Sequence, residues 1–160
     1  LRGSNSMTMY RNGLAIWDSA DLLDQIQTTA FGVANINGSH SLSSDKSTMN
    51  YVGQDRSDDK GSEPEGVAIG MVGDRRIAIL GLERMSALAV FDITQPRNPI
   101  FQEWLQMLPT KATPAKDVKY WSPEGIVFVP AAQSPSGKAL IITSYELSGS
   151  LSIHQIESSN

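Results

Sequence analysis

The sequence has 160 residues, 13 Lys and Arg against 17 Asp and Glu, a net charge of −4 and 40% hydrophobic residues. This suits roughly one domain with a real hydrophobic core. The acidic balance argues against a nucleic-acid partner, because phosphate contacts need clustered Lys and Arg. The absence of cysteine excludes disulfides, thiolate nucleophiles and Cys-based zinc sites. No apolar run approaches the roughly 20 residues of a membrane span, so we expect none in this segment.

Residues 1–18 predict two short strands, because Asn12-Gly13 between apolar runs is a strong signal for a β-hairpin. Residues 19–62 read as an insertion. Asp18-Ser19 offers a helix cap, and Leu22, Leu23, Ile26 and Ala30 follow at helical spacing, which predicts a short helix to about Ala30. From Asn35 to Ser62 the composition turns to Ser, Asn, Gly and Asp, which predicts a mobile surface loop.

Residues 63–106 predict four strands joined by short links. The first two, Val67 to Val72 and Ile77 to Leu82, are nearly continuous apolar runs, so we expect both of their faces to be buried. Parallel strands need connections of a dozen residues or more, so these short links predict antiparallel hairpins. We expect a linker loop over 107–122 and the same strand pattern again over 123–160.

An internal repeat supports this division, since Pro64-Glu65-Gly66 recurs as Pro123-Glu124-Gly125, 59 positions later. Short antiparallel sheets that are buried on both faces and repeat in the sequence are typical of β-propeller blades. We therefore predict an all-β fold: a partial β-propeller of two to three antiparallel four-stranded blades, plus one short helix in the insertion. Residues 1–18 supply the outer strands of a truncated blade, 63–106 a complete blade and 123–160 an incomplete last blade. The expected partners are the remaining blades of a parent chain, or a second copy that associates through exposed blade faces.

Two glutamate pairs are the candidate site. Glu65 and Glu83 lie equally far from Asp74, and Glu124 and Glu146 lie equally far from Pro135, so a simple hairpin register sets each pair opposite one another. Like charges directly opposite are unfavourable and need compensation by a divalent cation, an Arg or Lys, or a shared proton. We expect Gly66 to allow close approach of another backbone.

Calcium or another hard cation suits such oxygen ligands, and the acidic run of Asp55, Asp58, Asp59 and Glu63 offers further oxygens. Its spacing is not that of an EF-hand. The alternative for each glutamate is a structural one, as a cap of backbone amides or as a partner in a salt bridge.

Several segments resemble the choice-of-anchor I family. They are 55–66 followed by Gly81-Leu82-Glu83-Arg84, 90–94 with Pro96 and Pro99, and 122–125 with 134–138. The likeness runs from about Gly3 to Ile156 and is most specific from Asp55 onward. It implies a secreted or surface-anchored β-propeller, some of whose relatives are described as alkaline-phosphatase-like and others as mesenchyme-specific cell-surface glycoproteins.

Two functions of different classes stay open at this point. One is a metal-dependent phosphoester hydrolase, in which glutamates hold calcium; the other is a non-catalytic extracellular scaffold, adhesion or ligand-binding propeller. The sequence contains no Walker loop, Gly-x-Ser-x-Gly elbow or dinucleotide fingerprint, so no catalytic residue is assigned.

Overall fold

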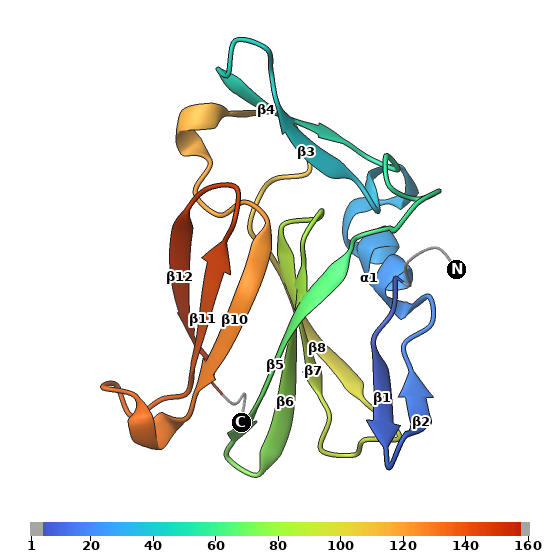
Figure 1. Cartoon of the computed structure of the whole chain (residues 1–160), viewed down its shortest axis with the longest axis vertical. Helices are drawn as coiled ribbons and strands as arrows, with labels where there is room; N and C mark the ends of the chain where they lie inside the picture. The colour runs from blue at the N-terminus through green and yellow to red at the C-terminus, as the bar shows by residue number, and fades with distance from the viewer. Residues whose placement is uncertain (1–4, 158–160) are drawn as a thin grey trace.

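A computed structural model describes residues 5–157 of the chain (Figure 1). Within that range the fold consists of small antiparallel sheets and one α-helix. The strands are β1 (Thr8–Arg11), β2 (Leu14–Asp18), β3 (Ser39–Leu42), β4 (Thr48–Val52), β5 (Pro64–Val72), β6 (Arg75–Leu82), β7 (Ala87–Asp92), β8 (Ile100–Gln106), β9 (Thr113–Pro114), β10 (Pro123–Val129), β11 (Leu140–Tyr145) and β12 (Ser150–Gln155), and the helix is α1 (Leu22–Phe31).

The central element is a four-stranded sheet in the order β5-β6-β7-β8. Each strand pairs antiparallel with its neighbour in sequence, as the short links predict. The β5–β6 hairpin turns at Gly73, whose φ of +61° suits a residue without a side chain. A bulge between Pro64 and Gly66 leaves Glu65 without a direct cross-strand partner.

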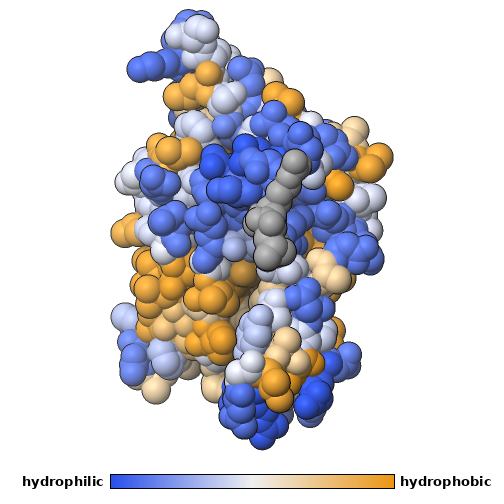
Figure 2. All heavy atoms as spheres, turned by 45° about the vertical axis from the view of Figure 1, so that its right-hand side comes forward, coloured by the Kyte–Doolittle hydropathy of each residue, from blue (hydrophilic) through white to orange (hydrophobic). Residues whose placement is uncertain are grey.

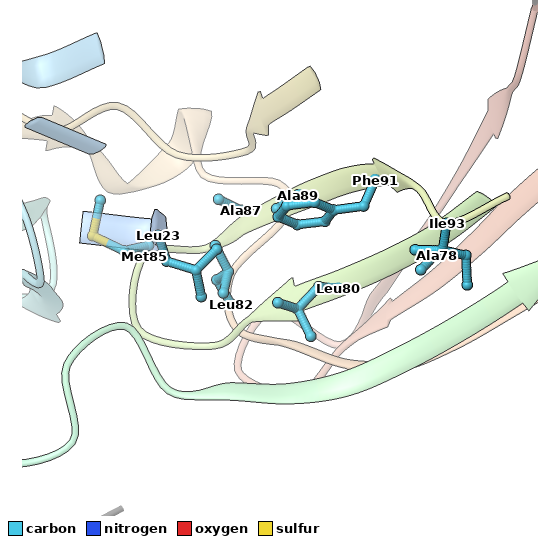
Figure 3. Close-up of a cluster of buried hydrophobic side chains, with 9 residues drawn as sticks. All are labelled: Leu23, Ala78, Leu80, Leu82, Met85, Ala87, Ala89, Phe91 and Ile93. Atoms are coloured by element: carbon cyan, nitrogen blue, oxygen red, sulfur yellow. The ribbon is translucent and has the colours of Figure 1, made fainter. Parts of the chain in front are cut away.

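The two inner strands of the central sheet, β6 and β7, are buried on both faces, which confirms the prediction for the apolar run of β6. One face, drawn in Figure 3, carries side chains from β6 and β7 with Leu23 of α1 at one end of the cluster. The other face belongs to a second cluster that includes Ile141 of β11. Because successive side chains of a strand point to opposite faces, the apolar residues of β6 and β7 contribute alternately to the two clusters.

A three-stranded sheet in the order β10-β11-β12 packs on the second face, with Ile126 and Phe128 against the cluster (Figure 1). Glycines let β10 come close to β5. A Cβ atom at Gly66 would lie 3.0 Å from the carbonyl oxygen of Glu124, and one at Gly70 would lie 2.1 Å from the ring of Phe128. The close backbone approach expected at Gly66 is therefore present at the contact between the two sheets.

The β1–β2 hairpin lies on the opposite side of the central sheet, where Met7 and Met9 pack against the first cluster. Its turn is at Asn12-Gly13, with φ values of +52° and +78°. These positive values are those of a type I′ turn, which the Asn-Gly pair favours. The sequence prediction of a hairpin is thus confirmed at this point.

The insertion differs from the prediction in two respects. The helix begins at Leu22 after Asp21, and the side chain of Asp18 instead accepts a hydrogen bond of 2.7 Å from the Ala20 N–H. Residues 35–62 are not a plain loop, because β3 and β4 form a hairpin there, to which β9 from the predicted linker adds a third strand. Met49 of this hairpin is 1% exposed and Tyr51 packs against the first cluster, so two side chains of β4 anchor the hairpin.

Burial on both faces does not extend to every apolar strand. On β5, Val67 and Ile69 are each 56% exposed, and on the last sheet Val127 and Ile153 are 57% and 65% exposed. Val67 and Ile69 lie on the face that the two-stranded β1–β2 sheet covers only in part. Val127 and Ile153 lie on the outer face of the last sheet, which no further sheet of the described residues covers. The fold is therefore an all-β, partial propeller-like stack that does not close. The helices within residues 5–157 are too short or too polar to cross a membrane.

Candidate functional site

Three glutamates converge at the end of the β5–β6 hairpin that lies away from its turn. Glu63, Glu65 and Glu83 each offer a carboxylate oxygen, and these oxygens lie within 4.8 Å of one another. Pro64 pairs with Leu82, and the backbone N–H of Glu83 donates a 2.9 Å hydrogen bond to the carbonyl of Glu63. The predicted register, with Glu65 directly opposite Glu83, is therefore wrong, because the bulge takes Glu65 out of register and Glu63 bonds to Glu83 instead. A bulge between Pro123 and Gly125 has the same effect on Glu124 in the second pair. The carboxylates of Glu65 and Glu83 still lie close to one another, together with that of Glu63.

Glu63 is the best compensated member of this cluster. Its side chain is 2% exposed, and Arg56 Nη2 and Arg84 Nε donate to its two oxygens at 2.7 and 3.0 Å. Burial alone would raise the pKa of Glu63, but the hydrogen bond from Arg56 and the charge of Arg84 outweigh it and lower the pKa. Glu63 is therefore held as a carboxylate between two guanidinium groups.

Glu83 has the opposite electrostatics. Burial raises its pKa, and the neighbouring carboxylates of Glu63 and Glu65 raise it further, although Arg84 opposes them. Ser122 Oγ, which comes from the start of the last sheet, donates a 3.2 Å hydrogen bond to Glu83 Oε1. The carboxyl of Glu83 thus lies at the contact between two sheets.

The second pair repeats the backbone of the first without its cluster. The N–H of Glu146 donates 2.9 Å to the carbonyl of Ser122, which matches the Glu83–Glu63 bond. Ser122 also shares the left-handed backbone of Glu63, with φ of +66° against +50°. Glu124 and Glu146 are both exposed, and neither belongs to the group of close carboxylates found among residues 5–157.

The acidic run contributes Glu63 to the cluster, together with Arg56, which neutralises it. Asp59 lies 2.7 Å from Arg56, the residue that binds Glu63. Neither Asp58 nor Asp59 is part of the three-glutamate group.

The sequence placed Glu63 in the acidic run that could add oxygens to a cation, but it did not predict that Glu63 would be buried between two arginines. The signal is visible in the repeat, because Glu63 and Ser122 occupy matching positions before Pro64 and Pro123. The aligned position is a glutamate in the first copy and a serine in the second. This difference in charge marks the position at which the first copy gains an additional carboxylate.

Of the three forms of compensation that opposed glutamates require, the structure shows two at the first pair. Arg84 supplies positive charge, since its guanidinium lies 3.5 Å from Glu83, and the raised pKa of Glu83 favours a retained proton. A hard cation such as Ca²⁺ binds six to eight oxygens. Both oxygens of Glu63 already accept from guanidinium groups, so Glu65 and Glu83 are the carboxylates left for a cation.

The stacked antiparallel sheets are those of a propeller-like protein, and a family comparison is more specific. The model of the choice-of-anchor I domain matches residues 2–96, which is more than half of the chain. The chain belongs to the choice-of-anchor I family. This membership indicates a cell-surface or extracellular protein. The match ends before the second repeat, so the likeness noted at 122–138 lies outside it. No curated protein and no solved structure matches the chain.

Proposed function

We propose that this chain is a non-catalytic scaffold segment of a surface-associated β-propeller. The observation that carries the proposal is the pairing of Glu63 with Arg56 and Arg84, at 2.7 and 3.0 Å, in a side chain that is 2% exposed. A buried carboxylate with two guanidinium partners is a structural tie, because its lone pairs and charge are already satisfied. Ser122 joins Glu83 of the same cluster across the sheet contact.

A calcium-dependent phosphoester hydrolase is the second candidate. It is favoured by the approach of three carboxylate oxygens to within 4.8 Å of one another. In this function Glu65 and Glu83 would hold calcium, and the ion would polarise a phosphate ester and activate water. Arg84 opposes it, because its guanidinium lies 3.5 Å from Glu83 and repels a cation at the same place.

Calcium titration followed by thermal unfolding separates the two candidates. The scaffold proposal predicts the same unfolding temperature in millimolar calcium and in chelator, and no hydrolysis of an aryl phosphate ester. The hydrolase predicts stabilisation by calcium and turnover, both of which Glu65→Gln should reduce. Glu124→Gln is the matched control, since Glu124 holds the same place in the other repeat and stands outside the cluster. Calcium-dependent turnover that Glu65→Gln abolishes and Glu124→Gln leaves intact would contradict the scaffold proposal.

A scaffold of this kind has neighbours on both sides of its stack. The remaining blades of a parent chain are the proposed neighbours, since blades of a propeller pack face to face. Self-association through the same faces is the alternative, and sedimentation at increasing concentration of the chain distinguishes it from a monomer.

A further inference from the structure

A groove lies between β1 and the exposed side of β5. It has a volume of about 330 Å³ and includes Met7, Met9, Val67 and Ile69 among its lining residues. Hydrophobic surface gathers on this side of the molecule beside the β1–β2 hairpin (Figure 2). Within residues 5–157, β1 pairs only with β2, so its edge toward the groove has no strand beside it.

The internal repeat shows what kind of element covers such a face. By strand register, Val67 and Ile69 of β5 correspond to Ile126 and Phe128 of β10. Those two β10 residues are partly buried, because they pack on the β5–β8 sheet. The equivalent β5 residues remain 56% exposed, and the sheet next to them has two strands instead of four.

β1 occupies the place of a third strand. Met7 and Met9 pack β1 against the central sheet. Within its own sheet β1 corresponds to β7, because β2 follows and pairs with β1 as β8 follows and pairs with β7. The strands that would complete its sheet are therefore counterparts of β5 and β6. Such a hairpin would pair with the free edge of β1 and cover Val67 and Ile69 with its own apolar side chains.

We propose that the groove is a strand-addition site that accepts an antiparallel β-hairpin of the β5–β6 type. Main-chain hydrogen bonds to the edge of β1 supply affinity in this mode, and the apolar side chains of alternate positions supply specificity. The occupant is an extended, mainly apolar hairpin with small residues on the face that meets β5, as Ala68 and Gly70 are on the face that meets β10. This inference rests on the proposed propeller scaffold.

The probe is a synthetic peptide with the sequence of residues 63–83, added to the 160-residue chain. The chain has no cysteine, so single cysteines report exposure without background. Ile69→Cys tests the groove, and Val52→Cys on β4, at 52% exposure, is the matched control. Saturating peptide should slow thiol labelling at position 69 about tenfold or more and leave position 52 within about twofold, because an added strand must leave before the thiol reacts. A peptide carrying Ile77→Ser and Ile79→Ser should protect much less.

Hydrogen exchange of the β1 amides distinguishes strand pairing from apolar adsorption. Pairing predicts that amides of residues 8–11 exchange more slowly when the peptide is bound. Protection of position 69 without slower exchange in β1 would overturn the proposal, as would labelling that the peptide does not change. Protection that appears without peptide and grows with protein concentration would show a second copy as the occupant, and would also overturn it. None of these readouts involves calcium or turnover, so failure here is distinct from failure of the scaffold function.

Discussion

Ser122 donates a 3.2 Å hydrogen bond to the Glu83 carboxyl across the contact between the central sheet and the last sheet. The backbone N–H of Ser122 also donates to Ser86 Oγ at 3.1 Å. Ser122, which directly precedes β10, is therefore held by two side chains of the turn between β6 and β7. Both bonds are buried. They couple the ionisation of one carboxyl group to the packing of two sheets.

Replacement of Glu83 should change how stability depends on pH. The raised pKa of Glu83 means that the folded chain binds this proton more tightly than the unfolded chain, so this group lowers stability as pH rises above its unfolded pKa. Glu83→Gln removes that loss and keeps a hydrogen-bond acceptor for Ser122. The free energy of unfolding of the variant, relative to the wild type, should therefore be higher at pH 8 than at pH 5. A difference that does not vary with pH would contradict the raised pKa. Denaturant titration at both values measures it.

Removal of Arg84 should destabilise the chain by leaving Glu63 partly unpaired. Arg84→Ala is expected to cost about 1–3 kcal/mol, the range for a buried polar group that loses a partner. Arg75→Ala is the control, since Arg75 is 45% exposed and lies 3.9 Å from Asp92, and it should cost less than about 0.5 kcal/mol. Equal losses in urea unfolding for the two variants would show that the Glu63 pairing contributes nothing special.

His40 should make the chain sensitive to mild acid. Its ring is buried, with Nδ1 3.3 Å from the carbonyl of Arg84 and Nε2 3.1 Å from the carbonyl of Pro109. Burial lowers the pKa of His40 more than these two carbonyls raise it. The unfolded chain therefore binds the proton more tightly, and stability should fall as pH drops through the unfolded pKa of about 6.5.

His40→Gln tests this dependence, because it has no titratable ring. The wild type should lose more stability than the variant between pH 7.5 and pH 5. If the wild type instead gains stability relative to the variant in acid, the two carbonyls hold a charged imidazolium and the lowered pKa is wrong.

Equivalent positions in the two copies of the repeat should respond differently to an introduced charge. Ile153 of β12 corresponds by register to Val90 of β7, yet Ile153 is 65% exposed and Val90 is 9% exposed. Ile153→Lys should change stability by less than about 0.5 kcal/mol, because its side chain already faces water. Val90→Lys should prevent folding, since it buries an unpaired charge between two sheets. Circular dichroism of the pair distinguishes these outcomes, and loss of folding in Ile153→Lys would mean that its face is covered.

Much of this architecture follows from the sequence. The continuous apolar run of β6 predicted burial on two faces, and the short links predicted antiparallel pairing. The same prediction was wrong for β5, because Val67 and Ile69 are each 56% exposed. The β3–β4 hairpin was missed because Met49 is its main buried apolar side chain, so its strands lack the hydrophobic alternation that marks a half-buried strand. Its stability depends on contacts with distant positions, such as His40 with Pro109.

The candidate site was predictable only in part. The sequence brought Glu65 and Glu83 to the same end of one hairpin, because the position of a tight turn depends on short-range sequence. It did not predict the bulge that takes Glu65 out of register with Glu83. The burial of Glu63 could not be foreseen, since it depends on Arg84, 21 residues away, and on a left-handed backbone at a charged residue. The sequence does place Arg84 beside the first pair and no basic residue beside the second, but it did not show the part of Arg56.

The most direct test of the account is a double-mutant cycle at the contact between the two main sheets. A Cβ atom at Gly70 would meet the ring of Phe128 at 2.1 Å, so Gly70→Ala should cost about 1–3 kcal/mol through overpacking. In the Phe128→Ala background the same change should cost almost nothing, which gives a coupling energy of about 1 kcal/mol or more. Stacked neighbouring blades predict this coupling in the free energies of unfolding. Additive effects of the two substitutions would contradict the packing of the last sheet on the central one.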